Sequence, residues 1–186
     1  MLIGIAGTDG SGKGTAVTYF VDQHGFTHYS ARAILMLELA RRNVDPTRAN
    51  MRLIANEMRE QYGNDYVVVH NLKKIVADGI ENAIIESIRT IAEAETLKQN
   101  GGILIAIDAD QTRRYERVQA RRSETDKVTY EEFVAHEALE SNDPNPHGMQ
   151  KQKVIEMADY LILNNGTTED LYATLEALLR DIKTKQ

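Results

Sequence analysis

Short apolar runs alternate along the chain with longer stretches in which apolar residues recur every three or four positions. Runs rich in Ile, Leu and Val are typical of buried parallel strands, and the longer amphipathic stretches are typical of the helices that cover them. The pattern predicts five strands, at residues 2–6, 26–29, 82–86, 103–108 and 160–164. It predicts helices at residues 13–24, 30–43, 47–62, 65–78, 90–99, 110–122, 129–140, 148–157 and 168–183. We therefore expect an α/β fold in which helices wrap a five-stranded parallel sheet.

Turn-forming residues mark the ends of these elements. Thr129 with Glu132 has the spacing of a capping box, and Thr167 with Asp170 has the same spacing with a shorter acid. Residues 141–148 combine polar turn formers with two prolines, which predicts a surface loop that is either a mobile flap or an ordinary connection. Glycines follow several predicted helices, where they commonly cap the carboxyl end: Gly25, Gly63, Gly79, Gly101 and Gly102.

The segment between the first predicted strand and the first predicted helix, residues 7–15, is Gly-Thr-Asp-Gly-Ser-Gly-Lys-Gly-Thr. A strand, a glycine-rich loop and a helix in this order form a phosphate-binding loop, whose amides and helix N-terminus bind a polyphosphate. Lys13 is expected to bridge the β- and γ-phosphates. A plain turn is the alternative, but such a turn has no use for a lysine behind three spaced glycines. The residues expected to bind the nucleotide are Asp9, Gly10, Ser11, Gly12, Lys13, Gly14 and Thr15.

One position departs from the usual phosphate-binding pattern, because Gly14 stands where Ser or Thr would ligate Mg²⁺ and Thr15 comes one residue later. The resulting G-K-G-T sequence resembles that of adenylate kinase and related nucleoside monophosphate kinases. This resemblance implies ATP and Mg²⁺ as cofactors, a three-layer P-loop kinase fold, a metal held mostly through water, and contact of Thr15 with phosphate.

The overall composition narrows the function classes. The chain of 186 residues has the length of one domain, which we expect to span 1–186. The absence of cysteine excludes disulfides, thiolate metal sites and a cysteine nucleophile, and it suits a reducing compartment. No apolar run approaches the length of a membrane span, so we expect a cytoplasmic protein without a membrane partner. The net charge of -6 argues against a nucleic-acid partner, so any anion site is expected to be local.

Glu86 and Arg89 follow a buried strand and are candidates for chemistry. An acid at this strand tip lies close to the metal and its waters in phosphate-loop enzymes, so Glu86 is expected to orient them. Arg89 would hold a phosphate bidentately. The alternatives are a helix cap for Glu86 and a surface salt bridge for Arg89.

Residues 84–95 resemble the adenylate kinase segment D-G-F-P-R-T, one residue shorter and without the proline, and its acid and arginine match Glu86 and Arg89. A wider resemblance covers nearly the whole chain, from Ile3 through Gly166. It is to adenylate-kinase-related and dephospho-CoA-kinase-like proteins, including kinase-like domains joined to deoxycytidylate deaminases. This resemblance implies that residues 30–78 are acceptor-binding helices and that residues 122–148 form a short lid.

Three further groups are candidates. Arg113, Arg117 and Arg121 lie four residues apart on one helix face, which is either a clamp on the transferring phosphoryl group or a solvated basic face. The resemblance to adenylate kinases favours Arg117 and Arg121 as catalytic. It also implies that the turn at residues 164–166 after the last strand, with Asn165, holds the adenine through backbone amides and carbonyls, although a plain turn is the alternative. Residues 30–32 supply the third group, in which Ser30 and Arg32 are expected to bind the acceptor nucleotide.

Three functions are consistent with these residues. Transfer to a hydroxyl, as in dephospho-CoA kinases, benefits from a carboxylate base, whereas a monophosphate acceptor is already anionic. Residues 28–32 contain no acid, which favours a nucleoside or deoxynucleoside monophosphate kinase over a dephospho-CoA kinase, in which Glu86 would have to be the base. The third hypothesis is a nucleotide-binding regulatory NTPase, because the acceptor segment is altered. No feature distinguishes a dimer face from an ordinary amphipathic helix.

Overall fold

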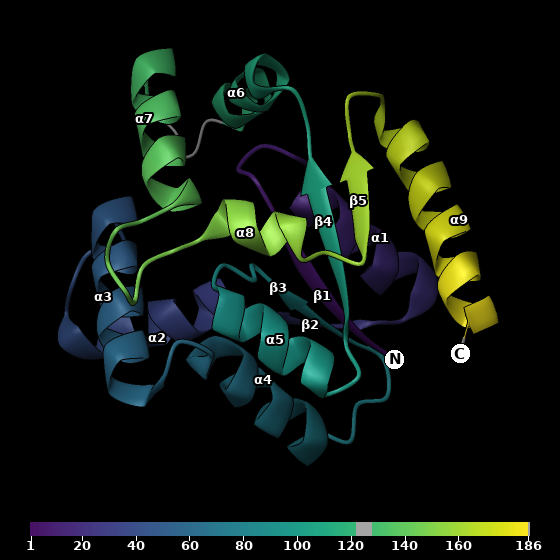
Figure 1. Cartoon of the computed structure of the whole chain (residues 1–186), viewed down its shortest axis with the longest axis horizontal. Helices are drawn as coiled ribbons and strands as arrows, with labels where there is room; N and C mark the ends of the chain where they lie inside the picture. The colour runs from purple at the N-terminus through teal and green to yellow at the C-terminus, as the bar shows by residue number, and fades with distance from the viewer. Residues whose placement is uncertain (122–127, 186) are drawn as a thin grey trace.

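The computed structural model describes residues 1–121 and 128–185, and its centre is one parallel sheet (Figure 1). The strand order is β2-β3-β1-β4-β5, and every neighbouring pair is parallel. The strands are β1 (Leu2–Gly7), β2 (Thr27–Ser30), β3 (Ala83–Glu86), β4 (Ile103–Asp108) and β5 (Tyr160–Leu163). The predicted five-stranded parallel sheet is therefore confirmed, with strand ends that differ from the expected ones by at most one residue.

The helices also follow the predicted pattern. They are α1 (Lys13–His24), α2 (Ala31–Arg42), α3 (Arg48–Tyr62), α4 (Tyr66–Ala77), α5 (Ile91–Gln99), α6 (Gln111–Ala120), α7 (Tyr130–Ser141), α8 (Lys151–Glu156) and α9 (Thr168–Lys185). The largest difference is at α8, which begins three residues later than expected. Its predicted first turn belongs instead to the preceding loop, where Gly148 N donates to Asn145 O at 2.8 Å and Met149 O accepts from Asp143 N at 3.0 Å.

Most of the predicted helix ends are confirmed. Thr129 and Glu132 form a complete capping box, and Thr167 Oγ1 accepts a hydrogen bond from Asp170 N at 3.2 Å. Thr90 and Glu93 form a second capping box, at the start of α5, which was not among the predicted ones. Residues 122–127 of the expected lid lie outside the described residues. Among the predicted capping glycines, all but Gly102 have positive φ: Gly25, Gly63, Gly79 and Gly101.

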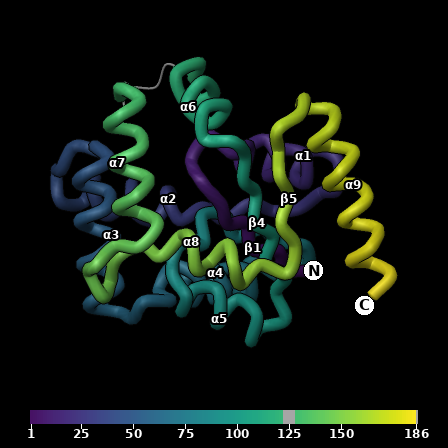
Figure 2. Tube along the Cα trace, turned by 45° about the horizontal axis from the view of Figure 1, so that its top comes forward, coloured from purple at the N-terminus to yellow at the C-terminus, as the bar shows by residue number. Residues whose placement is uncertain are grey.

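Two helical layers enclose the sheet (Figures 1 and 2). Alternate strand residues point to opposite faces, so Ile3 and Ile5 of β1 pack with α1 and α9, while Ala6 packs with α4, α5 and α8. Ile3 and Ile5 are fully buried, as is Leu104 of β4 on the other face. Because both faces of the central strands are covered, β1, β3 and β4 are apolar along most of their length, whereas the edge strand β2 is Thr-His-Tyr-Ser.

A third apolar cluster lies beside the sheet and unites α2, α3 and the start of α4. Its members include Ile34 and Leu39 of α2, Ile54 and Met58 of α3, and Val67 of α4. Figure 2 shows α7 alongside α3, and Arg48 at the start of α3 contacts Asp9 in the loop that follows β1. The cluster therefore holds α3 beside the end of the sheet where the phosphate-binding loop begins.

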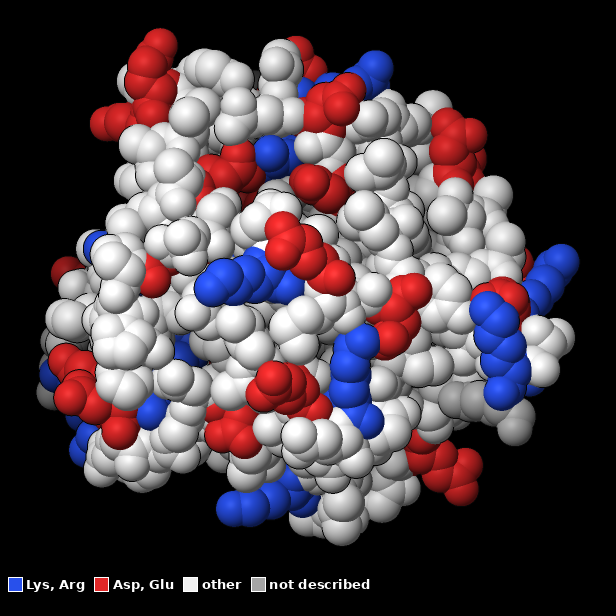
Figure 3. Space-filling view, viewed as in Figure 1, with Lys and Arg blue, Asp and Glu red and all other residues white. Residues whose placement is uncertain are grey.

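None of the helices in the described parts of the chain is long and apolar enough to cross a membrane. On the face seen in Figure 3, Lys and Arg side chains are interspersed with Asp and Glu. Cations gather instead in a cavity, described below.

Candidate active site

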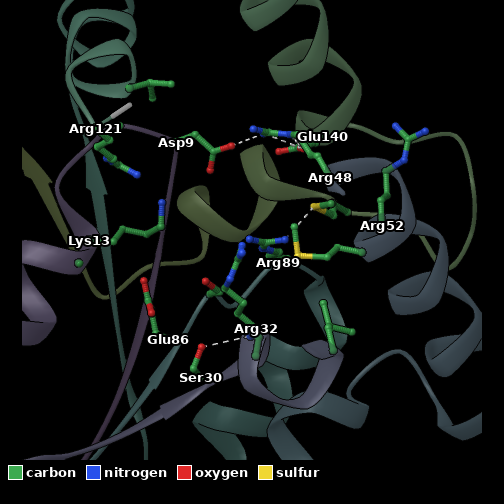
Figure 4. A pocket seen from close by; sticks show the side chains of 18 of the residues that line it. Asp9, Lys13, Ser30, Arg32, Arg48, Arg52, Glu86, Arg89, Arg121 and Glu140 are labelled. Carbon is green, nitrogen blue, oxygen red and sulfur yellow. Dashed lines mark hydrogen bonds and ion pairs between the residues drawn. The ribbon is translucent and has the colours of Figure 1, made fainter. Parts of the chain in front are cut away.

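A cavity of about 480 Å³ opens at the carboxyl ends of β1 and β3 (Figure 4). Open parallel sheets bind ligands at the carboxyl ends of their strands, where the connections after two adjacent strands lead to opposite sides of the sheet. Here β1 leads to β2 on one side, and its neighbour β3 leads to β4 on the other. The phosphate-binding loop, α2, α3, the turn after β3, and the ends of α6 and α7 supply its lining. The predicted site residues among the lining are Asp9, Gly10, Gly12, Lys13, Gly14, Thr15, Ser30, Arg32, Glu86, Arg89 and Arg121.

The phosphate-binding loop has the backbone geometry that its glycines predict. Gly12 has a φ of 103°, and a Cβ there would lie 2.4 Å from Asn164 Nδ2. A side chain at this position would therefore be strained and would also clash with Asn164. Helix α1 begins at the next residue, so its first amides and its positive dipole end face the loop. Ser11 is fully buried and does not line the cavity, unlike the neighbouring loop residues.

Lys13 lies in the cavity with its ammonium turned onto the loop itself. Lys13 Nζ donates a hydrogen bond to Thr8 O at 2.6 Å. Burial lowers the pKa of Lys13 to about 8, and the nearby charges of Lys151 and Arg89 act in the same direction, while Asp9 opposes them. An anion placed beside this ammonium would stabilise its charged form, as phosphate does in a phosphate-binding loop.

Asp9, Arg48, Glu140 and Lys151 form a closed set of ion pairs, which we call the charge ring (Figure 4 labels the first three). Arg48 Nη2 contacts Asp9 and lies 2.9 Å from Glu140 Oε1. Lys151 Nζ lies 3.3 Å from Asp9 Oδ1 and contacts Glu140. Burial alone would raise the pKa of Asp9, but Lys151, Lys13 and Arg48 hold that pKa well below its usual value. The ring joins the phosphate-binding loop to α3, α7 and α8.

Glu86 is the last residue of β3 and faces the cavity near Lys13. His28 Nε2 lies 3.1 Å from Glu86 Oε2. Burial opposes ionisation of this carboxyl, but the hydrogen bond and charge of His28, together with Lys13 and Arg89, lower the pKa of Glu86 below its usual range. The structure thus places the ionised carboxylate of Glu86 near Lys13 of the phosphate-binding loop.

Arg89 is held in place by its backbone. Arg89 N donates to Glu93 Oε2 at 2.6 Å, and Arg89 O accepts from Gln150 N at 2.8 Å. Glu93 is in turn paired with Arg59 at 3.4 Å, and the side chains of this pair are 0% and 4% exposed respectively. These contacts fix the turn after β3 to α3, α5 and the start of α8, while the Arg89 side chain lines the cavity.

A second cavity of about 340 Å³ adjoins the loop on the side of β5. Arg117 lines it and donates to Asn164 O at 2.9 Å and to Gly166 O at 3.3 Å, while Arg121 lines both cavities. Asn165 lines neither cavity, because its side-chain amide is paired with Asp110. Its neighbour Asn164 lines the second cavity and donates to Ser11 O at 2.8 Å. The turn is therefore where we expected it, with the adjacent asparagine facing the cavity.

Arg48, Arg52, Glu140 and Lys151 were not identified in the sequence. Arg48 and Arg52 lie four residues apart in α3, so the spacing that drew attention to Arg117 and Arg121 also applies to them. Glu140 and Lys151 belong to different short helices, and no local pattern marks them. Tertiary contacts alone bring these two into the charge ring.

The described residues contain no group of three or more His, Asp or Glu side chains placed to hold a metal ion directly. Mg²⁺ keeps several waters and commonly takes one or two protein ligands together with substrate phosphates. Thr15 and Glu86 both line the main cavity, so these residues fit a magnesium ion held through water.

Comparison with known proteins supports this fold. The chain is 28% identical over 180 residues to a UPF0200 protein of Hyperthermus butylicus, covering 96% of this chain and 93% of that one. It is 29% identical over 185 residues to a UPF0200 protein of Methanocaldococcus jannaschii, covering 98% and 90% of the two chains. Both alignments span nearly the full length of each protein.

Two solved kinases share the architecture. A shikimate kinase from Bacteroides thetaiotaomicron superposes with a TM-score of 0.62 at 14% identity, covering 97% of this chain and 98% of that one. A dephospho-CoA kinase from Campylobacter jejuni superposes with a TM-score of 0.57 at 15% identity, covering 100% and 98%. These similarities confirm the predicted P-loop kinase fold. Residues 3–145, well over half of the chain, match the AAA domain family. The chain therefore belongs to the AAA domain family and has a P-loop kinase-like fold.

Proposed function

We propose that the protein is an ATP-dependent, Mg²⁺-assisted phosphotransferase whose acceptor is a nucleoside or deoxynucleoside monophosphate. The observation that carries this proposal is the arginine content of the cavity in a chain of net charge -6. Guanidinium groups hold phosphates through paired hydrogen bonds, and an acceptor that already carries a phosphate matches them. The arginines on the acceptor side of Lys13 are Arg32, Arg52 and Arg89, together with Arg48, which is already paired with Asp9 and Glu140.

The donor nucleotide would occupy both cavities. The phosphate-binding loop would hold its phosphates, with Thr15 and Glu86 at the waters of the metal, and the second cavity would take the nucleoside. The metal, when bound, supplies charge neutralisation to the phosphates. Arg121 lines both cavities, a position suited to the charge that develops on the transferring group. Arg117, assigned to catalysis from the sequence, binds the turn after β5 and would shape the nucleoside side.

The acceptor would lie between α2 and α3. Ser30 and Arg32 line this part of the cavity, and Ser30 also caps α2 by accepting from Arg32 N at 3.1 Å. Residues 30–78 would then be the acceptor-binding part of a single domain, and residues 122–148 its lid. The attacking oxygen of a monophosphate is anionic, so Glu86 need not remove a proton and can orient water.

Dephospho-CoA kinase is the second candidate. Three carboxylates, Asp9, Glu86 and Glu140, line the cavity, and a dephospho-CoA kinase is among the structural neighbours. A hydroxyl acceptor needs a base, and Glu86 is the best placed of the three, because Asp9 and Glu140 are both paired with Arg48 and Lys151. A regulatory NTPase is the third candidate, which would hydrolyse ATP without an acceptor.

The proposal is tested by ATP consumption with Mg²⁺ and each common ribo- or deoxyribonucleoside monophosphate, dephospho-CoA, or no acceptor. Stimulation by one monophosphate is the expected result. Stimulation by dephospho-CoA alone would refute the proposal and would mean that Glu86 or another acid serves as the base. Slow hydrolysis that no acceptor stimulates would favour the regulatory NTPase.

Arg89→Ala tests the acceptor side separately. We expect the kcat/KM for the acceptor to fall at least tenfold while the KM for ATP stays near that of the wild type, because a charge-assisted phosphate contact contributes about 1.5–3 kcal/mol. Arg180→Ala is the matched control, since Arg180 is exposed on α9 and pairs only with Glu176 among the described residues. Acceptor kinetics that are equal in both variants would remove Arg89 from the site.

A further inference from the structure

Ser87 has a backbone conformation that serine rarely adopts. Its φ is 71°, and Asn43 is the only other described non-glycine residue with positive φ. Asn43 caps the carboxyl end of α2, where asparagine is a common occupant. Ser87 has no such explanation, because it follows a strand, and a serine there is strained where a glycine would not be.

The surrounding contacts impose this conformation. Ser87 N and Ile88 N both donate to Ile5 O of β1, at 2.9 Å and 3.2 Å, so two successive amides converge on one carbonyl. The side chain of Ile88 is buried in the core, and Arg89 N is bound by Glu93. The backbone of the turn is thus fixed on both sides of residue 87, and these contacts do not require a particular side chain at that position.

The hydroxyl of Ser87 is placed to meet a ligand. Ser87 lines the main cavity between two other lining residues, Glu86 and Arg89. Over the described parts of the chain, no residue forms a hydrogen bond with Ser87 Oγ. No such bond within these residues therefore offsets the backbone strain. Strained residues of this kind cluster at sites where the side chain performs a function.

We propose that Ser87 is an acceptor-binding residue whose hydroxyl donates a hydrogen bond to the acceptor phosphate that Arg89 binds, an inference that rests on the proposed function. A hydroxyl donor suits a phosphate oxygen, and its position next to Arg89 would give the phosphate two kinds of donor from one turn. The backbone strain then has a reason: glycine would relax the turn but would lose this contact.

Two variants separate the hydroxyl from the strain. Ser87→Gly removes both, while Ser87→Ala removes the hydroxyl and keeps the Cβ. We expect both variants to lose about tenfold or more in kcat/KM for the acceptor with an unchanged KM for ATP. Only the glycine variant should gain stability, by about 2–4 °C in Tm. Wild-type acceptor kinetics in either variant would overturn the proposal.

A binding measurement keeps this inference distinct from the proposed function. With the phosphate-binding loop saturated by a non-hydrolysable ATP analogue, inorganic phosphate is titrated against the thermal stability of wild type and both variants. If no monophosphate is phosphorylated by the wild type, the proposed function fails. The role of Ser87 in anion binding is then supported by a weaker phosphate response in both variants and overturned by a response equal to that of the wild type.

Discussion

The buried ion pair between Arg59 and Glu93 offers a sharp test of how the site is held together. Glu93 Oε2 accepts from Arg89 N at 2.6 Å and from Thr90 N at 3.1 Å, while Glu93 Oε1 lies 3.4 Å from Arg59 Nη2. Glu93→Gln preserves shape and can keep the carbonyl oxygen facing both amides. Its side-chain amide then faces the Arg59 guanidinium, donor against donor, and Arg59 loses its counter-charge.

The magnitude follows from burial. Breaking a buried pair by removing one charge costs about 3–5 kcal/mol, because the remaining charge stays desolvated. For a domain of this size, that loss corresponds to a fall in Tm of roughly 6–20 °C. Glu95→Gln is the matched control: it makes the same change on the same helix at an exposed position, and it should stay within about 0.5 kcal/mol of the wild type.

Urea unfolding measures the coupling free energy between Arg59 and Glu93. It compares the wild type, the single variants Arg59→Met and Glu93→Gln, and the double variant that combines them. The double variant should regain much of the stability lost by Glu93→Gln, since no buried charge is left without its partner. A loss below about 1 kcal/mol in Glu93→Gln would show that the buried Arg59 guanidinium does not need Glu93 as its counter-charge, and our account of the pair would be wrong.

Two further predictions concern the charged groups of the cavity. The pKa of Lys13 is about 8, so its ammonium loses its charge as the pH rises above 8. The affinity for ATP should then fall, by up to about tenfold per pH unit, because the phosphates bind the charged form. Isothermal titration from pH 7 to 9.5 measures this, and Lys13→Arg should lack the dependence, whereas an unchanged affinity in the wild type would contradict it. Lys151→Ala should cost about 3 kcal/mol in urea unfolding, because buried Glu140 loses one of its two cations. Lys185→Ala, at an exposed pair, should cost below about 0.5 kcal/mol, and equal losses would count against the charge ring.

The elements and the phosphate-binding loop were predictable because their signals are local. Apolar runs such as residues 103–108 have one stable location, between two helical layers, and glycines such as Gly25 mark helix ends by conformation. The capping box at the start of α5 was also predictable, because Thr90 and Glu93 have the same spacing as Thr129 and Glu132.

The charge ring could not be predicted in the same way. Its four members come from a loop and three helices, and their approach depends on how α3, α7 and α8 pack. The choice between Asn164 and Asn165 was also out of reach, since a difference of one residue in a turn exchanges which side chain faces the cavity. Sequence patterns thus located the loop and the strand ends, while the partners of Asp9 required tertiary structure.

The position of β1 within the sheet has a consequence for local opening. β1 is hydrogen-bonded to both β3 and β4, whereas β2, which leads into α2 and the acceptor-side residue Arg32, lies at an edge. Central strands exchange their amide hydrogens only through global unfolding, while edge elements open at lower free energy. We therefore expect the β1 amides near Ile5 to be among the last to exchange with deuterium and those of β2 and α2 to exchange earlier. The phosphate-binding loop would then extend from the most persistent part of the molecule, leaving the acceptor side free to adjust its shape around a substrate.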